Sequence, residues 1–209
     1  MRNIYLTILF ISLVLSIFSY KKDKALYLFP FLLSAALLSD IGSAILKHYQ
    51  INFYFLYHIY LLFEYAILSY YFYQVINLSL VKRIILYSIP SFTVLSIIFS
   101  LSIVGVNEYP NWQTIIECIL LIIWVTIALF TIEVKESKSI LLFPMFWICI
   151  GVLIYQCGIF TFTGMFNYLL KSKSDLFERL RSYHIVFNCI LYTLYSIAFI
   201  CSHRTKKYY

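Results

Sequence analysis

The chain has 209 residues, of which 63% are hydrophobic and only 12% are charged, and its mean hydropathy is +0.88. Soluble domains are about 45–50% apolar and about 25% charged, so this composition excludes a soluble globular domain, a disordered tail and a fibrous repeat. It predicts an integral protein of the lipid bilayer that forms a single domain over residues 1–209. The net charge of +7 is spread over short segments and a basic tail, as in membrane proteins anchored by cytoplasmic cations, so no nucleic acid is expected as a partner.

Seven apolar runs follow one another along the chain. A helix needs about 20 apolar residues to cross the bilayer core, and the runs are continuous rather than alternating, which favours helices over a barrel. The sequence therefore predicts an all-α, polytopic transmembrane bundle with helices at 3–19, 25–46, 52–74, 84–105, 113–134, 140–163 and 182–201. The first run precedes Lys21, Lys22 and Lys24 and no cleavage site follows it, so we expect it to be a retained helix.

The distribution of Lys and Arg predicts the orientation. With the N-terminus outside and the C-terminus inside, ten of the sixteen Lys and Arg residues lie on the inner side, as the positive-inside rule requires. The expected location is the inner membrane of a cell, with multiple passes. The one long connection is 164–181, where Ser174 or Asp175 could cap a helix and Glu178 follows Asp175 by three residues. We expect the seventh helix to begin there, either as an interfacial turn or as a cap over an outward-facing cavity.

A shift of 114 residues aligns the first hairpin with the fifth and sixth helices. Lys21, Lys24, Leu28, Phe29 and Pro30 then match Lys135, Lys138, Leu142, Phe143 and Pro144. Chance similarity in a chain rich in Ile, Leu and Phe is the alternative. A duplication would divide the chain into a first triplet (1–74), a linker helix (84–105) and a second triplet (113–201), a parallel repeat of the kind found in transporters. This layout resembles that of the small 3+1+3 sugar transporters and their PQ-loop relatives, whose Pro-Gln pair is not present.

Ionisable and amide residues gather in the outer half of the predicted spans, where they are expensive and point to function. We predict that they line an outward-facing polar pocket or a proton-linked site; the alternative is a polar glue between helices. On adjacent helices at one level, Asp40 and His58 are the candidate ion pair, whereas Glu64 points away from His58. The candidates for this site are Asp40, His58, Glu64, Tyr57, Tyr60, Glu117, Gln156, His184 and Asn188.

Catalytic and cofactor sites are not predicted. The cysteines form no CxxC or Cys/His spacing, so no metal is expected, and residues 182–201 contain no lysine that could hold retinal. Nucleophile elbows, HExxH and phosphate-binding loops are also lacking. Asp40, His58 and Glu64 could serve an intramembrane lipid hydrolase. The two acidic residues resemble those in the helices of lysoplasmalogenase-like enzymes, but Ser39 stands where those enzymes have glycine.

Three phrases resemble small uncharacterised seven-helix membrane proteins of AT-rich bacteria: Leu38-Ser39-Asp40-Ile41-Gly42, Tyr57-His58-Ile59-Tyr60-x-x-x-Glu64, and Phe146-Trp147 with Tyr155 and Gly158. The first hypothesis is a non-enzymatic membrane protein that senses or transports a small solute. The second is an accessory subunit that binds another protein, since accessories of phage-defence systems and of RNA-targeting CRISPR effectors are similar in size and hydrophobicity. The third is a lipid hydrolase. A protein partner or a second copy of the chain remains open in each.

Overall fold

The computed structural model describes residues 2–19, 24–102, 105–132, 139–171 and 176–205. Within these ranges the chain forms helices and no strand, so the predicted all-α class is confirmed. The seven long helices are α1 (Arg2–Ser19), α2 (Phe29–His48), α3 (Tyr54–Val75), α4 (Ser79–Ser102), α5 (Asn111–Phe130), α6 (Pro144–Lys171) and α7 (Leu176–Thr205). Two short 3-10 helices, η1 (Lys24–Leu26) and η2 (Ile140–Leu142), precede α2 and α6.

Prolines set the first turns of α2 and α6. Pro30 occupies the first turn of α2, and Pro144 is the first residue of α6. Proline suits this position because its fixed φ is helical and its missing N–H would have no partner there. Both helices therefore begin four residues later than the apolar runs predict, after a 3-10 turn in each case. By contrast, α4 begins at Ser79 rather than at 84, so that Lys82 lies inside the helix with its Nζ 5.5 Å from the ring centroid of Tyr73.

The predicted connection 164–181 is mostly helical. The sixth helix continues to Lys171 and the seventh begins at Leu176. The prediction that the seventh helix begins in this segment is confirmed, whereas the prediction that 164–181 is a long connection is wrong. The proposed caps Ser174 and Asp175 lie outside the described residues. The apolar pattern predicted both helices too short, because a helix can continue through polar residues beyond the hydrocarbon core.

Five helices of the described chain are long and apolar enough to cross a membrane: α2, α4, α5, the part of α6 at Pro144–Gly164 and the part of α7 at Tyr183–Ser202. The apolar helix at Asn3–Ser19 is shorter. Helix α3, which the sequence predicts to cross the membrane, is long enough but not apolar enough, because it carries seven tyrosines besides His58 and Glu64. Large apolar side chains such as Phe31, Leu38 and Phe130 are exposed on the outside of the bundle, as expected of a surface that faces lipid.

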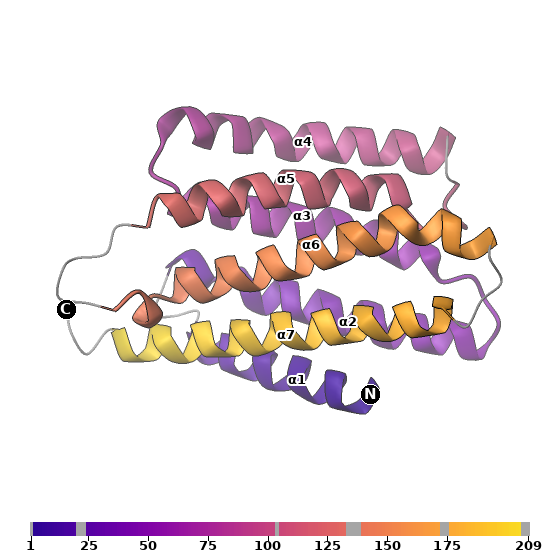
Figure 1. Cartoon of the computed structure of the whole chain (residues 1–209), viewed down its shortest axis with the longest axis horizontal. Coiled ribbons are helices and arrows are strands. Elements are labelled where there is room, and N and C mark those ends of the chain that lie inside the picture. Colours follow the sequence, from indigo (N-terminus) through magenta and orange to yellow (C-terminus); the bar gives the residue numbers. More distant parts are fainter. Residues whose placement is uncertain (1, 20–23, 103–104, 133–138, 172–175, 206–209) are drawn as a thin grey trace.

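Six helices close a ring, and α4 lies outside it. The packed neighbours are α1 with α2, α2 with α3, α3 with α5, α5 with α6, α6 with α7, and α7 with α1. The remaining helix packs against α3 and α5 and lies at one edge of the bundle in Figure 1, with α1 at the opposite edge. Thus α2 packs between α1 and α3 in the ring, and α6 packs in the same way between α5 and α7. A duplicated triplet joined by one linker helix would give this order.

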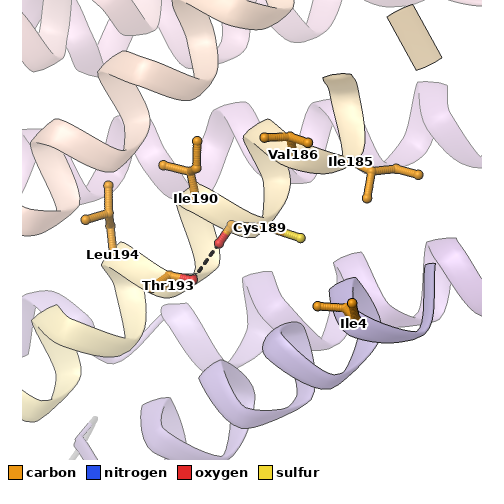
Figure 2. Close-up of a pocket in the computed structure, with 7 residues that line it drawn as sticks. All are labelled: Ile4, Ile185, Val186, Cys189, Ile190, Thr193 and Leu194. Carbon is orange, nitrogen blue, oxygen red and sulfur yellow. Dashed lines mark hydrogen bonds between the residues drawn. The ribbon is translucent and has the colours of Figure 1, made fainter. Parts of the chain in front are cut away.

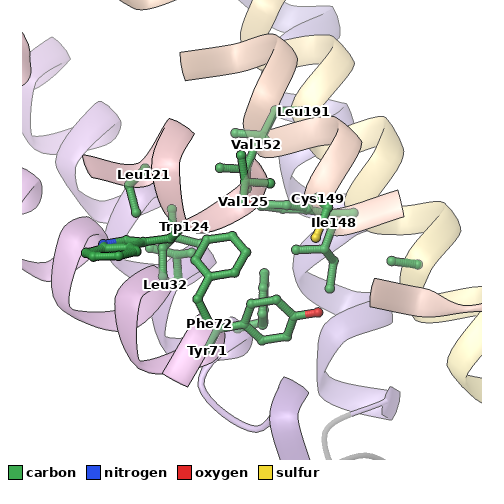
Figure 3. Close-up of a cluster of buried hydrophobic side chains, with 14 of the residues drawn as sticks. Leu32, Tyr71, Phe72, Leu121, Trp124, Val125, Ile148, Cys149, Val152 and Leu191 are labelled. Atoms are coloured by element: carbon green, nitrogen blue, oxygen red, sulfur yellow. The ribbon is translucent and has the colours of Figure 1, made fainter. Parts of the chain in front are cut away.

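The hydrophobic core fills the half of the ring where α1 ends. Its largest group surrounds Phe29, whose ring contacts those of Tyr71, Tyr195 and Phe199 edge-on at centroid distances of 5.3, 5.2 and 5.7 Å. Figure 3 shows further members of the core: Leu32, Phe72, Leu121, Trp124, Val125, Ile148, Cys149, Val152 and Leu191. We call this the inner half, because the predicted orientation places it on the cytoplasmic side, and we call the other half the outer half.

Candidate functional site

Polar side chains from all six ring helices converge inside the ring. They interact with one another through hydrogen bonds or electrostatically, and we name them the central polar cluster: Tyr5 of α1, Asp40 of α2, Tyr60 and Glu64 of α3, Glu117 of α5, Tyr155 of α6, and Tyr192 and Tyr195 of α7. The cluster contains no residue of the outlying helix α4. It begins in the outer half and reaches the aromatic core at Tyr195.

The position along the helices gives the depth of two carboxyl groups in the bundle. Glu117 lies six residues after the start of α5, or about 9 Å along the axis, and Glu64 lies ten residues after the start of α3, or about 15 Å. The bilayer core is about 30 Å thick. Glu117 therefore lies nearer to one end of the bundle, and Glu64 lies near its middle.

The three carboxyl groups of the cluster differ in their partners. Asp40 accepts a hydrogen bond from the hydroxyl of Tyr5, and Glu64 interacts with the hydroxyl of Tyr60 one helical turn before it. Oε1 of Glu117 is buried and has no hydrogen-bonding partner among the described residues. Glu117 is therefore the carboxyl group whose hydrogen-bonding capacity the fold leaves unused.

Charge is also unbalanced in the cluster. Glu64 and Glu117 are 7% and 4% exposed and interact electrostatically with each other, and no Lys, Arg or His of the described chain pairs with either of them. A buried carboxylate is costly unless a proton, a cation or several donors compensate its charge. The arrangement can therefore take up positive charge from outside the chain. No group of three or more metal-ligating side chains occurs in the described residues, so the predicted lack of a metal site stands as an expectation.

An aromatic group lies over the outer end of the cluster. Tyr109, in the connection between α4 and α5, packs against the rings of Tyr54 and Tyr57 at centroid distances of 6.4 and 6.0 Å. Tyr109 also lies near Glu117 and Thr114, and burial raises the pKa of its hydroxyl above the ordinary value. Tyr109 thus remains a neutral hydroxyl near neutral pH. Tyr57, which the sequence assigned to the pocket, belongs to this outer group instead.

His58 faces α4 and not Asp40. Its Nδ1 lies 2.8 Å from Oγ of Ser100, and its Nε2 lies 2.9 Å from the backbone oxygen of Glu108. Both ring nitrogens are thereby occupied, and Asp40 accepts a hydrogen bond from Tyr5 of α1. The predicted Asp40–His58 ion pair is wrong, because equal depth on adjacent helices does not fix the direction in which each side chain points.

Three other candidates lie on α6 and α7. Gln156 is buried on α6. Nδ2 of Asn188 lies 3.1 Å from Nδ1 of His184 and 3.0 Å from its backbone oxygen. The His184 ring faces Tyr155 and Phe162 at centroid distances of 6.5 and 6.2 Å. His184 and Asn188 therefore form a local pair on α7, and the contact of His184 with Tyr155 joins this pair to the central polar cluster.

Two cavities lie beside the cluster. A groove of about 390 Å³ runs between α1 and α7 and is almost wholly apolar (Figure 2); it is lined by Ile4, Ile185, Val186, Cys189, Ile190, Thr193 and Leu194. A smaller cavity of about 190 Å³ between α3 and α4 contains His58, Ser96 and Ser100 in its wall. Neither is lined by Glu64 or Glu117, so the carboxyl groups are packed among side chains rather than open to these spaces.

The sequence analysis missed several residues of the site. Tyr5, Tyr155, Tyr192 and Tyr195 belong to the cluster. Ser100 contacts His58, and Gln113 contacts Ser100. Gln113 and Glu117 are four residues apart on one apolar helix, a spacing that places both side chains on one face. This spacing could have revealed Gln113. The tyrosines carried no such signal, because this chain has 20 of them.

No family description, no curated protein and no solved structure matches this chain. The geometry of the cluster is therefore the basis for a functional interpretation.

Proposed function

We propose that this chain is a multi-pass protein of the inner membrane that senses or transports a small solute, and that the central polar cluster binds the solute or the protons linked to it. The observation that carries the proposal is the convergence of polar residues from all six ring helices around two buried carboxyl groups that have no cationic partner in the described part of the chain. A cluster that only held helices together would pair its groups, yet one oxygen of Glu117 has no hydrogen-bonding partner among the described residues.

The asymmetry of the ring supports access from the outer side. Aromatic and aliphatic side chains pack the inner half, including Phe29, Phe72 and Phe199, each of which is fully buried. Glu117 lies nearer to the outer end, close to Tyr109, and Glu64 lies near the middle of the bundle. A ligand that reaches Glu117 from outside passes the aromatic group around Tyr109, whereas a ligand from inside passes the whole core.

The packing order supports the 3+1+3 layout and with it the resemblance to small transporters built in that way. If α1, α2 and α3 correspond to α5, α6 and α7, the contact of α3 with α5 corresponds to the contact of α7 with α1. The cluster then lies between two repeats, which is where parallel-repeat transporters bind their substrates.

A stability screen of the purified protein tests the proposal. A panel of sugars, amino acids, carboxylic acids and organic amines is added to the wild type, to Glu64→Gln and Glu117→Gln, and to Glu108→Gln as the matched exposed control. A bound solute at 100 times its Kd stabilises the folded state by about 2.7 kcal/mol. We expect at least one solute to raise the Tm of the wild type and of Glu108→Gln, and to raise that of the two cluster variants much less.

Two outcomes contradict the proposal. One is a panel in which no solute stabilises the wild type. The other is a solute that stabilises all four proteins equally, since its site would then lie away from Glu64 and Glu117.

A further inference from the structure

The groove between α1 and α7 is separate from the central polar cluster. Its volume is about 390 Å³, and its wall consists of the side chains drawn in Figure 2. The one hydroxyl group among them, that of Thr193, donates to the backbone oxygen of Cys189 at 2.7 Å. A polar ligand would therefore find almost no partner in the groove, whereas a hydrocarbon chain needs none.

The groove lies on the outside of the ring, where the chain faces lipid. Ile4 and Val186 in its wall are 65% and 44% exposed. On the side that faces the central polar cluster, the rings of Tyr5 and Tyr192 join the same two helices at a centroid distance of 5.9 Å. The groove is therefore open to the bilayer and does not lead into the cluster.

The groove has the length of one lipid leaflet. On α7 its wall runs from Ile185 to Leu194, which are two and eleven residues after the start of the span at Tyr183. At about 1.5 Å per residue these positions lie about 3 and 16 Å below the outer end of the span, and half of the hydrocarbon core is about 15 Å thick. Further inward the helices close, because Oγ of Ser19 donates to the backbone oxygen of Phe199 at 3.0 Å. One acyl chain of the outer leaflet would thus lie along the whole groove.

Each of the two helices carries an arginine just beyond the outer end of the groove. Arg2 is the first residue of α1 and precedes Ile4 by two positions. Arg181 of α7 precedes Ile185 by four positions, and this spacing places both residues on one face of the helix. The two arginines lie about 3 and 6 Å further out than the first residues of the wall. This is the level at which lipid headgroups lie, since Tyr183 between them is exposed and tyrosine favours the interface.

The charge at this end of the bundle is positive. The described outer ends of α1, α6 and α7 hold one acidic residue, Glu178, and four cationic residues: Arg2, Lys171, Arg179 and Arg181. Guanidinium groups bind phosphate through two parallel hydrogen bonds, and cationic residues at a membrane surface attract anionic headgroups. The charge therefore favours a lipid with a negative headgroup over a zwitterionic one.

We propose that the groove between α1 and α7 binds one anionic phospholipid of the outer leaflet, with an acyl chain along the groove and the phosphate beside Arg2 and Arg181. A second copy of the chain fits this surface less well. Packed through the same face, it would bring its own arginines to the same level, and like charges repel. The inference goes beyond the proposed function, because the lipid site lies outside the ring and the solute site inside it.

Native mass spectrometry of the full chain, released from a neutral detergent, tests the site. The probes are dioleoyl phosphatidylglycerol, which is anionic, and dioleoyl phosphatidylcholine, which has the same chains and no net charge; the Kd of the first bound lipid is measured for each. We expect Arg2→Gln and Arg181→Gln each to weaken binding of phosphatidylglycerol about fivefold, the contribution of one cationic residue near a membrane surface. The wild type should accordingly prefer phosphatidylglycerol about 25-fold. Arg83→Gln, at an exposed position of α4, is the matched control and retains the wild-type Kd.

A second pair of variants tests the groove itself. Val186→Trp fills it with an indole ring and should weaken the binding of both lipids, whereas Val94→Trp, at an exposed position of α4, should leave both Kd values unchanged. The arginine variants keep the test valid if Val186→Trp does not fold.

Three results overturn the proposal. The first is an equal Kd of the two lipids for the wild type, and the second is a Kd of phosphatidylglycerol that is the same for Arg2→Gln, Arg181→Gln and Arg83→Gln. The third is a dimer of the wild type that Val186→Trp dissociates while its lipid binding stays unchanged, since the groove would then hold a second copy of the chain.

Discussion

The contact between α6 and α7 at Gly158 gives a sharp test of the packing. A Cβ added at Gly158 would lie 2.7 Å from each of Cε1, Cε2 and Cζ of Phe187. Favourable carbon–carbon contacts begin at about 3.5 Å, so the Phe187 ring or the helices must move by about 0.8 Å. Overpacking of this size costs about 1–3 kcal/mol. We therefore expect Gly158→Ala to unfold at lower temperature than the wild type.

Gly164 is the matched control on the same helix, because nothing lies within 4 Å of a Cβ added there. Gly164→Ala should be neutral or stabilising by up to about 1 kcal/mol, since alanine favours the helix over glycine. For a chain of this length 1 kcal/mol shifts Tm by about 2–4 °C. Thermal unfolding of both variants in one detergent measures the difference.

A double-mutant cycle shows whether the ring is the cause. Phe187→Leu removes the tip of the aromatic ring, so Gly158→Ala should cost less in that background, with a coupling of about 0.5–3 kcal/mol. The reasoning is refuted if Gly158→Ala is as stable as Gly164→Ala, or if Phe187→Leu leaves the cost of Gly158→Ala unchanged.

Three further predictions follow from buried polar groups and from the charge distribution. Glu117→Gln should raise the free energy of unfolding by about 1–3 kcal/mol, because it replaces a buried acid, which has no cationic partner among the described residues, by a group that never carries a charge. A lower Tm in thermal unfolding would contradict this. Tyr65→Phe removes the 2.7 Å hydrogen bond to Ser88 that joins α3 to α4, and should lower the free energy of unfolding by about 0.6 kcal/mol, the average for such bonds between membrane helices. Tyr87→Phe, at an exposed tyrosine, is the control. Equal unfolding curves for the two variants would argue against a contribution of this hydrogen bond. A reporter fused after Tyr209 should be active in the cytoplasm, and a periplasmic signal would invert the orientation.

Much of the architecture could be predicted because hydrophobic runs of this length have one stable solution in a bilayer. The number and order of the helices follow from seven runs that each approach the thickness of the hydrocarbon core. The ends were less accurate. At residues 25–28 and 140–143 the chain is apolar but not α-helical, because the following prolines favour a helix start and are preceded by short 3-10 turns.

The depth of the polar residues could also be predicted, since position along a helix fixes depth at about 1.5 Å per residue. Helical spacing also indicated that His58 and Glu64 lie on different faces, and the structure agrees, with His58 on the side of α4 and Glu64 in the ring interior. The partner of His58 could not be predicted in this way. Spacing gives the angle between two residues of one helix, but not the rotation of that helix relative to its neighbours.

The amino-acid sequence by itself determined the all-α class of the protein, its seven helices and the position of each carboxyl group along its helix. These properties depend on the length and local composition of each segment, which follow from the order of residues along the chain alone. Only the tertiary structure decided that α4 lies outside a six-helix ring, that Asp40 pairs with Tyr5, and that Glu117 keeps an unpartnered oxygen. Those facts depend on which faces meet, and side-chain packing over the whole ring sets the rotation of every helix at once.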